Sequence, residues 1–173
     1  MNTYDQVRRV IDQFFIIRTL RAGLVPDAPL SELGAVAATA ELRSYNVGAV
    51  LFHEGDAADG LHLVRSGSVS VSKKIGVRHI VTSYVAAGNY IGEMGLLGQT
   101  NRSATVRATV ATESIFLQAD VFLQMLDKND GLRERVQETV RERLSENSRM
   151  EAQPEAGDLI SFLMQQGLGE ATD

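Results

Sequence analysis

Glu93 and Arg102 are charged residues whose surroundings in the sequence favour binding of an anion. A strand that ends at Gly92 would bring the backbone close to a ligand, because glycine has no side chain. A helical turn over Met94 to Leu97 would point its free N–H groups outward, and such a helix start attracts anions. The planar guanidinium of Arg102 suits the oxygens of a phosphate. Together these features predict a phosphate-binding site.

Glu93 has a different predicted role, because a carboxylate next to a phosphate would be repelled by it. An ionised carboxylate only accepts hydrogen bonds, so its natural partner is a hydroxyl group such as that of a ribose. Glu93 and Arg102 can also neutralise each other in the ligand-free state. The pair therefore predicts a ligand that carries both a phosphate and a sugar.

Short strands separated by glycine turns are the elements that would position these residues. The run Ser68–Ser72 alternates strictly between polar and apolar residues, and His79–Val85 follows it after a turn at Gly76, so the two predict a hairpin. Two further strands are expected to contain Val106, Val110, Ile115 and Leu117. Many short strands without helical crossovers predict a barrel or a double-sheet roll.

Helices are predicted on both sides of the strand region. Thr3–Leu20 has apolar residues at the spacing of an amphipathic helix, namely Val7, Val10, Ile11, Phe14 and Phe15. Ser31, Leu33, Val36 and Leu42 predict a short helix with Ser31 as its candidate N-cap. A short helix is expected after Ala119 and a longer one from Asp130. The expected division is an N-terminal helical segment (1–30), a roll with following helices (31–150) and a C-terminal amphipathic helical segment (151–173).

Composition and charge exclude several classes of function. The chain of 173 residues has a net charge of −5 and no cysteine, which argues against a broadly basic nucleic-acid surface and excludes thiolate chemistry. Its three histidines are scattered, so no metal site is expected. We find no nucleophile–base pair and expect no enzymatic activity. No apolar run has the roughly 20 residues of a membrane span, and the N-terminus lacks the apolar core of a secretory signal, so we expect a cytoplasmic protein.

The central stretch resembles the phosphate-binding cassette of cyclic nucleotide-binding domains. The matching residues are Gly88–Leu97 followed by Asn101–Val106, against a family pattern of F-G-E-hydrophobic-[AG]-L, a short gap and P-R-[AST]-A. Phe52–Asp56 resembles the family's early "EGD" turn, and Leu61–Val69 resembles its first strand pair. The resemblance extends from about residue 33 to about residue 148. Two departures, Ile91 for the usual aromatic residue and Asn101 for proline, remove no ligand-binding group.

The resemblance implies a mainly β fold, an eight-stranded, jelly-roll-like β-roll with flanking N- and C-terminal helices. It implies cyclic AMP or cyclic GMP as the ligand, with cyclic AMP favoured and no separate cofactor. Arg102 would pair with the cyclic phosphate and Glu93 would bind the ribose 2′-hydroxyl. Backbone amides near Met94 and Ser103 would help to hold the phosphate. The implied ligand-binding residues are Gly92, Glu93, Met94, Arg102 and Ser103 in the cassette, Val71, Thr82 and Ile91 along the sugar and base, and Asn147 and Ser148 at the purine.

Three interpretations of the function remain open. The first is a regulatory module in which the nucleotide moves the helix that begins at Asp130. The second is the sensor part of a catabolite-activator-type transcription regulator whose DNA-binding domain is absent from this chain, since only about 25 residues, with a net negative charge, follow Ser148. The third is a degenerate roll with a structural role. We expect no nucleic-acid binding by this chain alone, an effector that the sequence does not identify, and either core packing or a homodimer contact through residues 130–148.

Overall fold

A computed structural model describes residues 3–98 and 100–151 of the chain. Residues 1–140 form one compact unit, and residues 141–173 form a second unit that is described over 141–151 only. The predicted C-terminal segment 151–173 therefore lies, apart from Glu151, outside the described residues. The candidate site belongs to the first unit.

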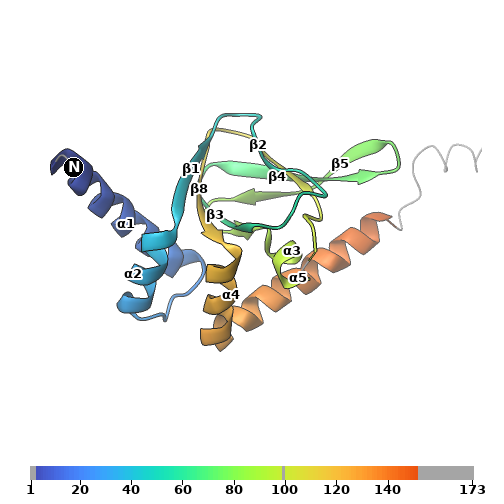
Figure 1. The fold of residues 1–173 in the computed structure, drawn as a ribbon. Coiled ribbons are helices and arrows are strands. Elements are labelled where there is room, and N and C mark those ends of the chain that lie inside the picture. The colour runs from blue at the N-terminus through green and yellow to red at the C-terminus, as the bar shows by residue number, and fades with distance from the viewer. Residues whose placement is uncertain (1–2, 99, 152–173) are drawn as a thin grey trace, which may run out of the picture. The chain divides into compact units, whose positions relative to one another are not determined.

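The first unit contains two four-stranded antiparallel sheets (Figure 1). One sheet has the order β1-β8-β3-β6 and the other the order β2-β7-β4-β5. The strands are β1 (Glu41–Tyr45), β2 (Val50–Phe52), β3 (Gly60–Ser66), β4 (Ser68–Ile75), β5 (Arg78–Ala86), β6 (Tyr90–Ile91), β7 (Thr105–Ala108) and β8 (Thr112–Gln118). The predicted eight-stranded roll is confirmed.

The hairpin of β4 and β5 also matches the prediction from sequence. Val69 pairs with Val85 and Val71 with Ser83, and the register shifts by one residue after Val71. Gly76 in the connecting turn has a φ of 61°, a conformation that glycine adopts without strain. The placement of Val110 in a strand was wrong, because β7 ends at Ala108 and Val110 lies in the tight turn before β8.

Five helices are described around the sheets: α1 (Thr3–Gly23), α2 (Leu30–Thr39), α3 (Glu93–Leu97), α4 (Ala119–Lys128) and α5 (Asp130–Glu151). The cap predicted for α2 was wrong. Pro29 occupies the N-cap position and Ser31 lies inside the first turn. The helix ends where Ala40 becomes extended, so Leu42 belongs to β1. None of the described helices is both long and apolar enough to cross a membrane.

Two apolar clusters hold the first unit together. The larger one joins helices to the β3–β8 sheet and includes Leu20, Leu33, Leu117, Phe122 and Val136. The smaller one lies between the two sheets and is formed by Val64, Val69, Val85, Ile91 and Val106. Since β6 contributes Ile91 to the smaller cluster and leads directly into α3, this packing determines the position of the residues that follow, Gly92 and Glu93.

Candidate functional site

Gly92 connects β6 to α3 in a conformation that few other residues could adopt. Its φ of 99° lies in the left-handed region, and a Cβ atom at this position would overlap the guanidinium of Arg102. The predicted helical turn is present as α3, which begins at Glu93. The glycine therefore both turns the chain and leaves room for the arginine.

Arg102 is the buried cation of the site. Its side chain is 1% exposed and donates from Nη1 to the carbonyl of Gly92 (3.1 Å) and from Nη2 to Oδ1 of Asp59 (2.6 Å). Its backbone N–H donates to the carbonyl of Asp56 (2.7 Å), and its carbonyl accepts from the N–H of Gly55 (2.9 Å). The loop before β3 thus holds both the backbone and the side chain of Arg102.

A ring and an unsatisfied donor complete the surroundings of Arg102. The guanidinium carbon lies 4.1 Å from the centroid of the Phe52 ring, the range of a cation–π contact. Nε of Arg102 is buried and has no hydrogen-bond partner among the described residues. Because a buried donor without an acceptor is costly, this atom indicates a capacity to bind an anion from outside the chain.

Asp59 is the residue that the sequence analysis missed. It forms the ion pair with Arg102, although its own side chain is 65% exposed. The sequence analysis singled out only Glu54, Gly55 and Asp56 of this loop and suggested Glu93 as the counter-ion. Asp59 precedes β3 directly and lies 43 positions from Arg102, so only the pairing of distant strands brings the two charges together.

Glu93, Met94 and Ser103 lie around the start of α3. Glu93 is fully buried at the first position of the helix, where a negative charge is favoured by the helix dipole. The Ser103 hydroxyl lies 3.7 Å from the Met94 sulfur, and both side chains are partly exposed. The structure brings Gly92, Glu93, Met94, Arg102 and Ser103 into one cluster; their contact with a ligand stays a prediction.

Three of the other predicted residues lie on the strands beside the cassette. Ile91 is buried in the smaller cluster, and Val71 packs against that cluster from β4. The Thr82 hydroxyl donates to the carbonyl of Val71 (3.3 Å) across the β4–β5 hairpin. Their role along a sugar or base stays a prediction.

Asn147 and Ser148 belong to the part of α5 that lies in the second unit. The Ser148 hydroxyl donates to the carbonyl of Leu144 (2.9 Å), a contact within the helix. Their contact with a purine stays a prediction.

His62 lies on β3, between β6, which leads into the cassette, and β8. Its ring is 5.7 Å from that of Phe52 and 4.9 Å from that of Phe116 (centroid distances), and Nδ1 is 3.1 Å from the Ser114 hydroxyl. Burial and, to a smaller extent, the positive charges of Arg102 and Arg43 together lower the pKa of His62 to about 3. The histidine is therefore neutral at physiological pH.

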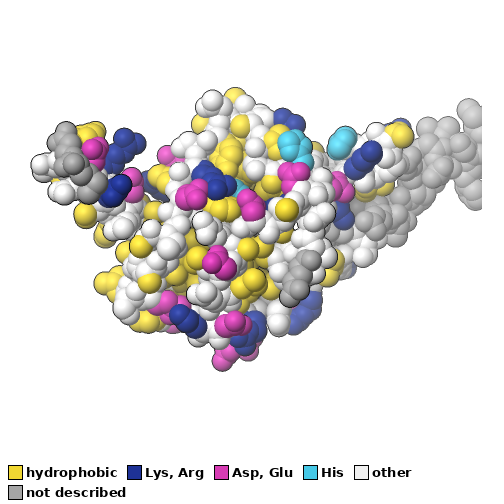
Figure 2. Space-filling model, in the orientation of Figure 1, with side chains coloured by type: hydrophobic (Ala, Val, Ile, Leu, Met, Phe, Trp, Pro, Cys, Tyr) yellow, Lys and Arg dark blue, Asp and Glu magenta, His cyan; other side chains and the backbone are white. Residues whose placement is uncertain are grey.

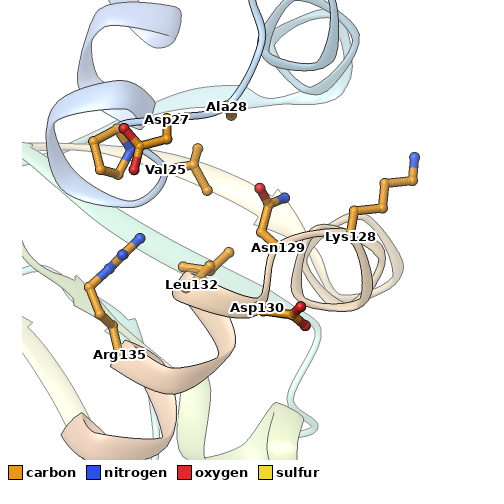
Figure 3. A pocket seen from close by; sticks show the side chains of 10 residues that line it. Val25, Asp27, Ala28, Lys128, Asn129, Asp130, Leu132 and Arg135 are labelled. Atoms are coloured by element: carbon orange, nitrogen blue, oxygen red, sulfur yellow. The ribbon is translucent and has the colours of Figure 1, made fainter.

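A separate hollow of about 220 Å³ is lined by residues that are distant in sequence from the cassette (Figure 3). It is lined by the loop between α1 and α2, including Val25 and Asp27, and by the junction of α4 and α5, including Asn129 and Arg135. None of the predicted ligand-binding residues lines it. No group of three potential metal ligands occurs in the described part of the chain.

The chain matches a protein-family model and is similar in sequence to known proteins. A model of the cyclic nucleotide-binding domain matches residues 42–129, half of the chain. The chain is 31% identical over 109 residues to the cAMP-activated global transcriptional regulator CRP of Salmonella typhimurium, covering 62% of this chain and 52% of that protein. It is 35% identical over 127 residues to glutaminase 1 of Bradyrhizobium diazoefficiens, covering 73% of this chain and 19% of that protein.

Solved structures show the same fold. The regulatory domain of Toxoplasma gondii PKA with cAMP matches with a TM-score of 0.60 and 28% identity, over 65% of this chain and 43% of that one. The chain spans about half or less of the length of each of these three proteins. Since the family model matches half of the chain and the two-sheet roll is the fold of its relatives, the chain belongs to the cyclic nucleotide-binding domain family.

Proposed function

We propose that this chain is a regulatory module that binds a cyclic nucleotide, cyclic AMP in preference to cyclic GMP, in the cassette around Arg102. The observation that carries the proposal is the buried guanidinium of Arg102, whose Nε has no acceptor within residues 3–98 and 100–151 and whose counter-ion Asp59 is mostly exposed. A cyclic phosphate has one negative charge, which matches one guanidinium. We further propose a cytoplasmic location, where such a ligand acts as a second messenger.

The residues of the site have distinct roles in this proposal. Arg102 donates to the cyclic phosphate, helped by backbone N–H groups near Met94 and Ser103, while Glu93 accepts from the ribose 2′-hydroxyl. Gly92 leaves the space that the guanidinium occupies. Val71, Thr82 and Ile91 line the sugar and base, and Asn147 and Ser148 contact the purine.

The preference for cyclic AMP is supported by the relatives. The names of the Salmonella regulator and of the Toxoplasma domain both contain cAMP. The hydroxyl of Ser103 is compatible with either base, so the sequence alone does not distinguish the two nucleotides. The proposed preference is therefore tested directly with both ligands.

Movement of α5 is the proposed output. The hydroxyl of Tyr90, two residues before Gly92, donates to that of Thr139 on α5 (3.0 Å), which links the cassette strand to the helix. Asn129 at the α4–α5 junction is extended and lies beside the hollow, and we place the pivot of the helix at this residue (Figure 3). In this proposal α5 has two positions in equilibrium, and a ligand that binds more tightly to one of them increases its population.

The similarity to the Salmonella regulator supports a narrower version of this role. The matched part covers 52% of that protein. The same module can therefore serve as the sensor portion of a longer regulator. Under either version the module signals through a partner or an attached domain and does not itself react with the nucleotide.

Replacement of Arg102 tests the proposal. Hydrogen bonds to a charged group contribute about 1.5–3 kcal/mol each, so Arg102→Ala should weaken binding of cyclic AMP by about 10- to 100-fold or more. Isothermal titration calorimetry with cyclic AMP and cyclic GMP measures this loss and the preference together. Arg107→Ala is the matched control, because Arg107 is an exposed arginine on β7. Equal affinity of the Arg102 and Arg107 variants would contradict the assignment.

A further inference from the structure

Helix α1 exposes apolar side chains that the proposed nucleotide site does not use. The exposed fractions are 70% for Tyr4, 53% for Val7, 47% for Ile11 and 62% for Phe14. We call these four residues the α1 seam. Val10, 66% exposed, and Phe15, 36% exposed, flank it. Figure 2 shows hydrophobic side chains on α1 at the left of the view, beside basic ones.

The spacing of the seam is that of a helix that pairs with another helix. Its members are separated by three, four and three residues, the 3.5-residue period of a two-helix contact. The residues of α1 that are buried against its own chain are Ile16 and Leu20, which are 5% and 0% exposed, while Phe15 contacts Arg65 at the edge of the seam. At 100° per residue Ile16 and Leu20 lie on the side of the helix opposite the seam. The seam therefore stays exposed to solvent while α1 remains docked.

The exposed area is sufficient for a specific contact. The six side chains of the seam and its flanks are large, and about half of their surface is open to solvent. They offer on the order of 600 Å² per helix, so two helices would bury on the order of 1,200 Å², the lower limit of stable protein interfaces. Exposed apolar surface of this kind commonly marks a contact with another molecule.

A second copy of α1 fits the seam in an antiparallel orientation. Continuing the seam by four and three residues leads to Arg18 and Arg21. A parallel pair would place each arginine against its own equivalent, which is repulsive. In an antiparallel pair centred between Val7 and Ile11, the arginines lie beyond the partner's seam and the two helix dipoles oppose each other favourably. Val7 then faces Ile11 of the second copy, and Tyr4 faces its Phe14.

We propose that two copies of this chain associate through an antiparallel contact of their α1 seams. This interface differs from the homodimer contact through residues 130–148 that the sequence left open. In α5, Leu132 and Val136 are 1% and 0% exposed and pack in the larger cluster of their own chain, whereas Leu144 is 50% exposed. The seam shares no residue with the proposed nucleotide site.

The oligomeric state of the full chain tests the proposal. Sedimentation equilibrium should show a dimer of about 38 kDa, twice the 18.8 kDa of one chain, at high protein concentration. The double variant Ile11→Glu/Phe14→Glu should be monomeric, with its dissociation constant raised more than about 100-fold, because two charges per helix would be placed against apolar side chains. Val77→Glu is the control, since Val77 is 95% exposed on the β4–β5 turn and should leave the dimer unchanged.

Cysteine cross-linking tests the orientation in a chain that is otherwise unchanged. The chain has no cysteine, so introduced thiols report only the chosen positions. A mixture of Val7→Cys and Ile11→Cys chains should form mixed disulfides on oxidation much faster than either variant alone. Cross-linking of Val7→Cys with itself at the faster rate would indicate a parallel pair and overturn the proposed orientation.

Three outcomes would overturn the proposal as a whole. One is a monomer at every concentration. The second is a dimer that persists in the Glu double variant but is lost in Leu144→Glu, which would place the contact on α5. The third is a monomer that binds vesicles of phosphatidylserine and phosphatidylcholine through α1, which would identify the seam as a lipid contact. Because nucleotide binding is measured separately by calorimetry, its failure would leave the dimer test intact.

Discussion

At the scale of single residues, the candidate site depends on how a buried guanidinium is accommodated. Arg102 has a carboxylate, a carbonyl and an aromatic ring as neighbours, and the carboxylate of Asp59 keeps most of its surface in water. A buried cation with a hydrated counter-ion can exchange that partner for another anion at a lower cost than a fully buried pair could. This arrangement suits reversible binding of a charged ligand.

Gly92→Ala should damage both the stability and the binding of the cassette. A left-handed conformation costs a residue with a Cβ about 1–2 kcal/mol, and the added atom would also push on Arg102. Urea unfolding should therefore show a lower free energy of unfolding, and calorimetry should show weaker binding of cyclic AMP. Gly34→Ala is the control, since the space around Gly34 in α2 is open and alanine there should stabilise the helix by about 0.5–1 kcal/mol. A fully stable Gly92 variant would contradict this account.

At the scale of elements, the cassette is held from two sides. β6 anchors it through Ile91 in the smaller cluster, and the loop before β3 holds Arg102 by backbone hydrogen bonds. α5 is linked to it through the hydroxyls of Tyr90 and Thr139. A conformational change in the cassette can therefore be transmitted to α5 through the two-residue strand β6.

Tyr90→Phe should loosen the first half of α5 without disturbing the roll. The variant keeps the ring and removes one hydrogen bond, which contributes about 0.5–1.5 kcal/mol. Amide hydrogen exchange over residues 132–140 should become faster by about the corresponding factor of 2 to 10. Tyr84→Phe is the matched control, because Tyr84 is 69% exposed on β5. Identical exchange in the two variants would show that this contact does not hold α5.

At the scale of the whole molecule, the burial of a neutral histidine makes folding depend on pH. The pKa of His62 is about 3 in the folded chain and has its ordinary value of about 6.5 in the unfolded chain. Between these values the unfolded chain binds the extra proton, so stability is fully present above about pH 6.5 and is lost as the pH falls.

Urea unfolding at pH 7 and pH 5 should show this loss, with His62 contributing up to about 2 kcal/mol at about 1.4 kcal/mol per pH unit. His62→Gln should be less stable at pH 7 but should lose less stability between pH 7 and pH 5 than the unchanged chain. His79→Gln serves as the control, because it removes an exposed histidine and leaves the buried His62 in place. A parallel pH dependence in both variants would mean that His62 is not buried in its neutral form.

The sequence by itself determined the class of fold and the central residues of the candidate site. Strict alternation in Ser68–Ser72 and the glycine turn at Gly76 are local signals, so the β4–β5 hairpin could be predicted. The spacing from Gly92 to Arg102 is likewise local and identified the cassette. Val110 was wrongly predicted to lie in a strand, because the chain turns there despite the β propensity of valine. The N-cap of α2 was also predicted wrongly, because proline occupies that position although serine is the preferred N-cap residue.

Only the tertiary structure decided which distant charges and surfaces meet. Asp59 reaches Arg102 because the loop before β3 packs against the segment after α3, a consequence of strand pairing that no local pattern encodes. Helical spacing likewise indicated that α1 is amphipathic but could not show that Ile16 and Leu20 face the roll while Val7 and Phe14 face solvent. Local propensity acts over a few residues, whereas burial depends on the summed packing of the whole chain, so these assignments required the folded structure.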